Sequence, residues 1–282
     1  MFAILKKRKL NDSMTLMVID APFIARKAKA GQFVILRVNE HGERIPLTIA
    51  DYDREKGTVT IIYQVVGKTT MLLDQLQEGD AILDFIGPLG RASGLEGYKR
   101  AAVIGGGAGC AIAYPQAKAL HALGAKVDMI AGFRSKDIII LEDEMRAACD
   151  SLTVMTDDGS NGHKGFVTDA LKKNIEAGAG YDLVVAIGPL VMMRAVCNLT
   201  KPYGIKTIVS MNPIMIDGTG MCGGCRVTVG GKTRFACVDG PDFDGHEVDF
   251  DETIKRSRTY AELEKEAGRD FKCRLMEGAK NA

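Results

Sequence analysis

The chain has 282 residues, of which 46% are hydrophobic and 26% are charged, and its formal net charge is +1. This length allows two domains of ordinary size and a small additional segment. The balanced charge gives no electrostatic reason to expect binding to nucleic acid or to an anionic membrane surface. The opening residues, MFAILKKRKL, have too short an apolar run for a signal peptide, and no later run is long enough to span a bilayer.

The N-terminal third of the chain contains short runs rich in β-branched and aromatic residues, separated by turn residues. These runs cover residues 15–19, 32–38, 45–49, 58–66 and 80–85. Their spacing predicts a small antiparallel β-barrel, which the Gly-Pro-Leu-Gly turn at residues 87–90 is expected to end. Residues 91–99 then form a linker.

From residue 100 onward, apolar strands alternate with helices. The predicted strands cover residues 101–104, 127–131, 152–155, 183–187 and 207–209, and the predicted helices cover residues 110–123, 140–149, 167–177 and 191–199. This alternation predicts a parallel, doubly wound α/β sheet. The charged sequence from about residue 252 to the end predicts an exposed helical tail.

The first of these strands is joined to its helix by Gly105, Gly106, Gly107 and Gly109. Glycines in such a turn allow a pyrophosphate to approach a helix N-terminus closely. The motif departs from G-x-G-x-x-G because Cys110 takes the place of the last glycine. A tight strand-to-helix turn without a ligand is therefore the alternative interpretation.

Loops after later strands carry Arg134, Asp157 and Gly188, at the edge of the sheet where nucleotides bind. An arginine there can hold a phosphate and a carboxylate can hold a ribose, although both are also compatible with solvated loop positions. Asp157 and Asp158 would repel the 2′-phosphate of NADPH and so favour NADH. Arg134 and Lys136 oppose this preference.

The barrel offers a second set of candidates for cofactor binding. Gly67, Thr69 and Thr70 lie between a strand and a predicted helix, where N–H and hydroxyl groups suit a phosphate. An ordinary threonine cap of the helix is the alternative. Thr48 can donate a hydrogen bond to the edge of a flavin ring, and Tyr63 can stack on a cofactor or pack in the core.

Glycine-rich sequence near the C-terminus holds Asp217, Cys222, Cys225 and Cys237. The D-x4-C-x2-C-x11-C spacing is that of plant-type [2Fe–2S] ligands, with aspartate in place of the first cysteine. Thiolates also bind zinc, but a zinc knuckle more often has two C-x2-C pairs or paired histidines. The segment is therefore predicted to bind a [2Fe–2S] cluster.

Two other cysteines are alternatives to the aspartate as fourth ligand: Cys197, in a predicted helix, and Cys273, in the polar tail. A chain with seven cysteines, three of them placed as metal ligands, fits a reducing cytoplasm better than a disulfide framework. No Ser/His/Asp or paired-carboxylate arrangement stands out in the sequence, so hydrolase chemistry has no support.

With a barrel, a nucleotide fold and this cysteine motif in order, the chain resembles the ferredoxin-NADP reductase superfamily, in its branch with a C-terminal [2Fe–2S] segment. The resemblance covers about residues 1–250. Two subfamilies are similar: electron-transfer subunits of dihydroorotate dehydrogenase, normally with four cysteines at the cluster, and small subunits of NADH-dependent reduced ferredoxin:NADP oxidoreductase, with aspartate and three cysteines. Residues 44–51, residues 67–70 and the Asp217 segment resemble the second more closely.

The resemblance implies FAD in the barrel and NADH at the glycine turn, with Gly188 close to the nicotinamide. The residues that it implies around FAD are Pro46, Leu47 and Thr48 by the isoalloxazine, Ile62, Tyr63 and Gln64 along the cofactor, and Gly67, Thr69 and Thr70 at the pyrophosphate. The flavin motif departs from the usual Arg-x-Tyr-Ser, because Ile45 lies two residues before the usual aromatic position and Arg44 is displaced by one. A role for Arg44 at the FAD phosphate therefore does not follow.

The predicted architecture is α+β and multidomain. It comprises an FAD-binding β-barrel (residues 1–98), an NAD-binding α/β domain (99–210), a [2Fe–2S] cluster segment (211–250) and a charged helical tail (251–282). Flavin, nicotinamide and cluster carry their own redox chemistry, so few catalytic side chains are needed.

We expect a cytoplasmic electron-transfer subunit that exchanges hydride with NAD(H) through FAD and passes single electrons through the cluster. The resemblance implies a larger flavoprotein partner linked to NADP(H) and ferredoxin, and flavin-based electron bifurcation. An electron-transfer subunit of dihydroorotate dehydrogenase is the alternative enzyme. A redox-inert, zinc-binding interaction module is the alternative of another class.

Overall fold

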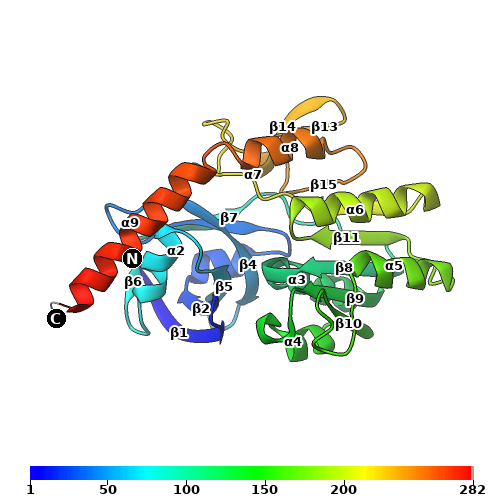
Figure 1. Cartoon of the computed structure of the whole chain (residues 1–282), viewed down its shortest axis with the longest axis horizontal. Coiled ribbons are helices and arrows are strands. Elements are labelled where there is room, and N and C mark those ends of the chain that lie inside the picture. The colour runs from blue at the N-terminus through cyan, green and yellow to red at the C-terminus, as the bar shows by residue number, and fades with distance from the viewer. Residues whose placement is uncertain (281–282) are drawn as a thin grey trace.

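The structure, a computed structural model, describes the backbone of residues 1–280 and the side chains of residues 1–271. Its N-terminal part is an antiparallel sheet that curls into a barrel, in the order β6-β1-β2-β5-β4-β3-β7 (Figure 1). The strands are β1 (Phe2–Asn11), β2 (Met14–Asp20), β3 (Phe33–Arg37), β4 (Ile45–Asp53), β5 (Thr58–Gln64), β6 (Ala81–Ile82) and β7 (Asp84–Leu89). Two short helices, α1 (Pro22–Lys27) and α2 (Lys68–Gln75), connect them. The predicted barrel is confirmed.

Strand alternation decides which barrel residues face the core. Along β5, the side chains of Val59, Ile61 and Tyr63 are at most 2% exposed, because successive residues point to opposite faces of a strand. Ile62 is half-buried and Gln64 is exposed on the outer face. The outer face of β5 is therefore the one that can meet a cofactor.

The sequence prediction missed β1, whose Lys-Lys-Arg-Lys run over residues 6–9 hides its strand pattern. β1 pairs with β2 along its length but with β6 only at Phe2 and Ala3, so most of its outer edge tolerates charge. The barrel ends at Leu89, within the predicted residues 87–90, but Gly87 and Pro88 lie inside its last strand, β7. β7 is an edge strand of its sheet, and edge strands accommodate proline.

The second part is a doubly wound sheet in the order β10-β9-β8-β11-β12-β15, as predicted for all but its last strand. The parallel strands are β8 (Arg100–Gly106), β9 (Lys126–Phe133), β10 (Ser151–Thr156), β11 (Leu183–Ile187) and β12 (Lys206–Ser210). The helices between them are α3 (Cys110–Ala122), α4 (Glu142–Ala147), α5 (Val167–Glu176) and α6 (Leu190–Thr200). The strand order reverses between β8 and β11, which is where such sheets bind ligands.

The segment that holds the cysteine motif folds back onto this sheet. It contains β13 (Arg226–Val229), β14 (Lys232–Phe235), α7 (Ala236–Asp239) and β15 (Asp242–Asp244). β15 pairs antiparallel with β12, and one hydrophobic core includes Cys225 and Cys237 together with Val209 of β12 and Ile35 of the barrel. Barrel, sheet and cysteine segment thus share a core, and the four-part division of the chain stays a prediction.

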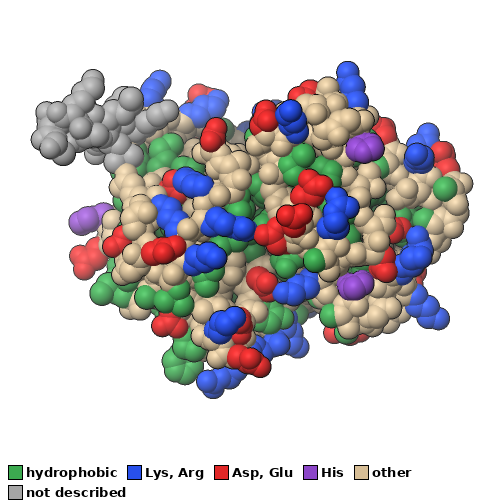
Figure 2. Space-filling model, turned by 90° about the horizontal axis from the view of Figure 1, so that it is seen from below, with side chains coloured by type: hydrophobic (Ala, Val, Ile, Leu, Met, Phe, Trp, Pro, Cys, Tyr) green, Lys and Arg blue, Asp and Glu red, His purple; other side chains and the backbone are tan. Residues whose placement is uncertain are grey.

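The tail forms α8 (Phe250–Ser257) and α9 (Ala261–Lys280), as predicted. α9 contacts α2 and runs along the barrel (Figure 1), and its side chains up to residue 270 are largely exposed. On the face shown in Figure 2, the basic and acidic side chains of the described residues are interspersed. The described part of that face therefore has no large patch of a single charge. None of the described helices is both long enough and apolar enough to cross a membrane.

The turn between β8 and α3 gives a test of packing. A Cβ atom on Gly109 would lie 2.4 Å from the carbonyl oxygen of Ile187 and 2.8 Å from Cα of Gly188. We expect Gly109→Ala to lower the free energy of unfolding by about 1–3 kcal/mol, since backbone would have to move. Chemical denaturation measures this, with Gly94→Ala as control, because a Cβ there meets no described atom within 4 Å. Equal losses in both variants would contradict the packing argument.

Candidate redox site

A cavity of about 790 Å³ lies at the carboxyl edge of the parallel sheet, between the sheet and the rim of the barrel. Seven of the predicted site residues line it: Gln64, Gly106, Gly107, Gly109, Arg134, Asp157 and Gly188. The cavity also includes residues that the sequence analysis missed, among them Asn11 and Ser13 of the barrel rim, Ser210 at the end of β12 and Asn212 just after it. These four residues belong to no recognisable motif, and the fold alone brings them together.

The glycine turn fits the approach of a pyrophosphate. Gly107 to Gly109 form a single 3₁₀ turn that opens into α3, whose N-terminus faces the cavity. Gly105 does not line the cavity: a Cβ there would lie 2.8 Å from Sγ of Cys110. Cys110 is fully buried, and burial raises the pKa of its thiol to about 12. Cys110 therefore packs as a neutral side chain behind the turn.

The two carboxylates after β10 have different surroundings. Asp157 lines the cavity, together with Arg134. Asp158 instead accepts hydrogen bonds from the hydroxyl and the N–H of Ser160, at 2.7 and 2.9 Å, and these bonds lower the pKa of Asp158. The same hydroxyl accepts the N–H of Lys136 at 2.8 Å. Asp157 is thus the carboxylate that can meet a ribose, whereas Asp158 holds the loop together.

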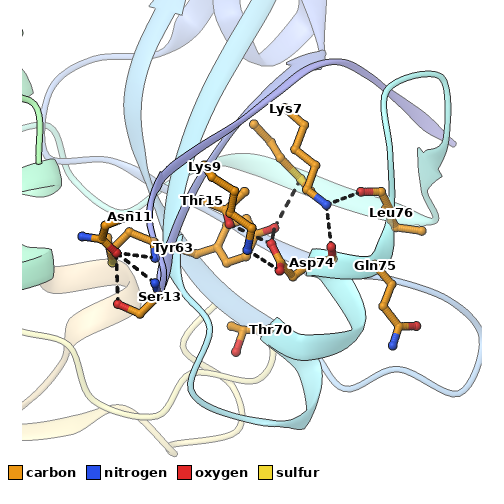
Figure 3. Close-up of polar contacts among 12 residues, drawn as sticks. Lys7, Lys9, Asn11, Ser13, Thr15, Tyr63, Thr70, Asp74, Gln75 and Leu76 are labelled. Carbon is orange, nitrogen blue, oxygen red and sulfur yellow. Dashed lines mark hydrogen bonds and ion pairs between the residues drawn. The ribbon is translucent and has the colours of Figure 1, made fainter. Parts of the chain in front are cut away.

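The residues of the barrel that are predicted to contact the flavin lie on two different faces of their strands. Pro46, Leu47 and Thr48 of β4 and Ile62 of β5 are half-buried. The ring of Tyr63 lies in the barrel core, and its hydroxyl lies 3.3 Å from a carboxylate oxygen of Asp74 (Figure 3). Burial, and secondly the charge of Asp74, raise the pKa of Tyr63. The side chain of Tyr63 therefore cannot stack on a cofactor, and a role there is limited to its backbone.

The start of α2 shows that the capping interpretation holds for Thr70. Its hydroxyl donates to the carbonyl of Gly67 at 3.0 Å and accepts the N–H groups of Val66 and Gly67, at 3.1 and 3.0 Å. Thr69 is buried, with its hydroxyl 3.5 Å from Glu43 Oε2. The free donors that this turn offers to a phosphate are therefore the backbone N–H groups of the first turn of α2.

A polar cluster that the sequence analysis missed holds α2 against the barrel (Figure 3). The carboxylate of Asp74 accepts Nζ of Lys9 at 2.5 Å and the hydroxyl of Thr15 at 2.7 Å. Burial favours the neutral acid, but these bonds outweigh it and lower the pKa of Asp74. Nζ of Lys7 donates to the carbonyl of Leu76 at 2.8 Å. This group of polar side chains fixes the C-terminal end of α2, opposite to the turn at residues 67–70.

The four predicted cluster ligands lie in two pairs. Cys225 and Cys237 are buried, with their sulfur atoms 3.3 Å apart. Asp217 accepts the N–H groups of Cys222 and Thr219 at 2.8 and 2.9 Å, and these bonds lower its pKa. Burial and the neighbouring Cys225 raise the pKa of Cys237 to about 12.

The spacing of the buried sulfur pair fits two ligands on one metal atom. Two thiolates on one tetrahedral metal, each about 2.3 Å from it, would lie roughly 3.8 Å apart, and the buried pair is already near that spacing. Among the described residues, no three His, Cys, Asp or Glu side chains converge on one metal position. A [2Fe–2S] cluster takes two protein ligands on each iron and so needs two pairs.

Cys197 and Cys273 are the alternatives to Asp217 as the fourth ligand. Cys197 lies buried in α6, where a Cβ on Gly245 would come within 2.5 Å of its sulfur. Burial, and secondly Asp244, raise the pKa of Cys197 to about 12. The side chain of Cys273 lies outside the described residues.

Comparisons with known proteins agree with this geometry. Residues 212–249 match the iron-sulfur cluster binding domain of dihydroorotate dehydrogenase B. The chain is 48% identical to a Thermotoga maritima homolog of the dihydroorotate dehydrogenase B (NAD(+)) electron transfer subunit, over 93% of this chain and 92% of that protein. It is 35% identical to the electron transfer subunit of that enzyme from Fusobacterium nucleatum, over 83% and 92%.

Solved structures show the same relationship. A chain of the NADH-dependent reduced ferredoxin-NADP oxidoreductase, studied for flavin-based electron bifurcation, superposes with a TM-score of 0.90 and 45% identity, over 95% of this chain and 97% of that one. An Amycolatopsis cytochrome P450 reductase shares the fold. It superposes with a TM-score of 0.58 and 22% identity, over 71% of this chain and 65% of that one.

The pairing of ligands gives a test of Asp217. We expect Asp217→Ala to lose or destabilise the cluster while flavin stays bound, because one iron would keep a single protein ligand. Asp217→Cys should retain the cluster with a shifted reduction potential, since a carboxylate is a harder donor than a thiolate. Iron and sulfide per flavin, and the EPR signal of the reduced protein, measure both. Cys273→Ala is the control that should keep a full cluster. A fully loaded Asp217→Ala protein with an unchanged EPR signal would exclude Asp217 as a ligand.

Proposed function

Because the chain belongs to the ferredoxin-NADP reductase superfamily, in the family of electron transfer subunits with a C-terminal iron–sulfur domain, we propose that it is the NAD(H)-linked subunit of an electron-bifurcating oxidoreductase. It exchanges hydride with NAD(H) through FAD and passes single electrons through a [2Fe–2S] cluster. A larger flavoprotein subunit, linked to NADP(H) and ferredoxin, is its partner. The likeness to the oxidoreductase chain over nearly the full length of both chains carries this proposal.

FAD, when bound, accepts two electrons as hydride and releases them singly. The residues of this chain bind and orient the groups. The residues that we assign to FAD are Pro46, Leu47, Thr48, Ile62, Gln64, the backbone of Tyr63, Gly67, Thr69 and Thr70. Those assigned to NAD(H) are Gly105, Gly106, Gly107, Gly109, Arg134, Asp157 and Gly188, with Gly105 acting through packing. Those assigned to the cluster are Asp217, Cys222, Cys225 and Cys237.

The dihydroorotate dehydrogenase B reading remains the second candidate, because the matched domain and several relatives carry that name. The aspartate in place of the first cluster cysteine favours the first candidate, as it does in the resemblance noted from sequence. The zinc-binding alternative has less support, since the matched domain binds an iron–sulfur cluster.

Purification of the native complex tests the function. We expect the chain to co-purify with a larger flavoprotein, identified by mass spectrometry, and to release FAD on denaturation and chromatography. A partner barrel enzyme that carries FMN would favour the dihydroorotate dehydrogenase reading. Release of FMN, or of no flavin, from the isolated chain would contradict the proposal, as would a colourless protein that holds zinc.

Nucleotide preference is a separate prediction. Because Asp157 lines the cavity, we expect NADH to reduce the flavin at least about tenfold faster than NADPH at equal low concentrations, a difference of about 1.4 kcal/mol. Asp157→Ala should narrow this ratio, and Asp158→Ala is the matched control, because that carboxylate is bound to Ser160. Stopped-flow absorbance gives both rates. Comparable rates with the two nucleotides in the unaltered protein would refute the preference.

A further inference from the structure

A buried carboxyl group lies where the barrel, the nucleotide sheet and the cysteine segment meet. It belongs to Asp242 on β15. Ser93, from the linker after β7, donates its hydroxyl to Oδ2, and Gln116 of α3 donates Nε2 to the same oxygen at 3.1 Å. On the barrel side, a Cβ atom on Gly31 would lie 3.1 Å from this oxygen. Ser210 of β12 is the cross-strand partner of Asp242, so its hydroxyl lies on the same face of the sheet, beside the carboxyl group.

Two acceptor atoms in this cluster are buried without a partner: Oδ1 of Asp242 and Oε1 of Gln116. A buried polar atom without a partner has lost its bonds to water and gained none in return, which destabilises the fold. One proton on Oδ1 removes both costs, because a carboxylic acid and a primary amide can form two reciprocal hydrogen bonds. The amide N–H already donates to Oδ2, and the acid O–H would donate to the amide oxygen.

The surroundings also favour the neutral acid. The side chains that face the carboxyl group from the linker, α3 and β12 are those of Ser93, Gln116 and Ser210, and all three are uncharged. Burial raises the pKa of Asp242, and the hydrogen bonds that these groups donate oppose the shift without cancelling it. A carboxylate here would therefore be a buried charge without a counter-ion.

The polar side chains around Asp242 are connected to the cavity. Ser210 lines the 790 Å³ cavity, so one hydroxyl group separates Asp242 from the site where the nucleotide is expected. A hydroxyl both donates and accepts a hydrogen bond, and can pass a proton by accepting one and releasing its own.

We propose that Asp242 is a proton-holding residue of the redox site: a neutral carboxylic acid, paired with Gln116, that exchanges its proton with the cavity through Ser210. The use of this proton in the redox reaction rests on the proposed function. When electrons arrive singly from the cluster, the flavin takes up two electrons and one proton before it can give a hydride to NAD⁺. The O–H bond of Asp242 breaks, Ser210 receives that proton and releases its own toward the cavity, and a carboxylate remains. When electrons flow from NADH to the cluster, the proton returns by the same route.

The first experiment tests the protonation state without using the reaction. Asp242→Asn replaces the acid by an amide that can keep both hydrogen bonds with Gln116. A raised pKa in the folded protein gives stability that is present at low pH and lost as pH rises through that pKa. We therefore expect the Tm of the unaltered protein to fall relative to Asp242→Asn as pH rises above the ordinary aspartate range. Infrared spectra at neutral pH should show a protonated carboxyl band that shifts in D₂O and is missing in Asp242→Asn.

Asp244→Asn is the matched control on the same strand. The carboxylate of Asp244 accepts Nζ of Lys206 at 2.7 Å, and despite its burial this bond lowers its pKa. Its contribution to stability is therefore lost as pH falls, which is the opposite sign, and the infrared band should remain. A Tm difference between Asp242→Asn and the unaltered protein that does not change with pH, or no protonated carboxyl band, would overturn the neutral acid. This holds whatever the partner or the reaction proves to be.

The second experiment tests the exchange of the proton. Two rates of flavin reduction are compared in the protein with its cofactors: by hydride from NADH, and by single electrons from a one-electron donor. We expect the ratio of the one-electron rate to the NADH rate to fall by about tenfold or more in Asp242→Asn and in Ser210→Ala, and to stay unchanged in Asp244→Asn. A merely structural role would slow both reactions together and leave the ratio unchanged, and that outcome would reject the exchange. A protein that contains no flavin would instead reject the proposed function.

Discussion

The pairing of β15 with β12 ties the cysteine segment to the nucleotide sheet. It sets Asp242, Phe243 and Asp244 of β15 opposite Ser210, Val209 and Ile208 of β12. The backbone makes a further bond at the same edge, from the N–H of Met211 to the carbonyl of Pro241 at 2.9 Å. A segment with little secondary structure of its own could not hold metal ligands steadily in isolation. Strand pairing supplies the rigidity that an electron-transfer site needs.

The same pairing brings the barrel into contact with the cysteines. The N–H of Arg91, just after the barrel, donates to the carbonyl of Gly240 at 2.7 Å, and its Nε donates to the carbonyl of Val238 at 3.1 Å. The core beneath is continuous from Ile35 of the barrel to Cys225 and Cys237. The barrel, the nucleotide sheet and the cysteine segment therefore meet at one junction. A shift of one of them changes the packing of the other two.

Much of this organisation was predictable from sequence, because it depends on local patterns. Alternating apolar strands and helices indicated the doubly wound sheet, and the spacing of Cys222, Cys225 and Cys237 indicated the iron–sulfur segment. Local patterns failed where tertiary contacts decide. The charged run over residues 6–9 hid β1, which pairs with β2 along its length. Strand parity turns the side chain of Tyr63 into the barrel core, which its place in a motif does not reveal. The pairing of Asp242 with Ser93 and Gln116 joins residues far apart in the chain, and no periodicity announces such a contact.

With FAD and the [2Fe–2S] cluster bound, we expect this one chain to take up hydride and to deliver single electrons through its own cluster. Anaerobic titration of the isolated protein with NADH, followed by visible absorbance and low-temperature EPR, tests it most directly. We expect the EPR signal of a reduced [2Fe–2S] cluster to grow as the flavin absorbance falls, without any partner subunit. A flavin that bleaches fully while the cluster stays oxidised, and is reduced only by dithionite, would contradict it.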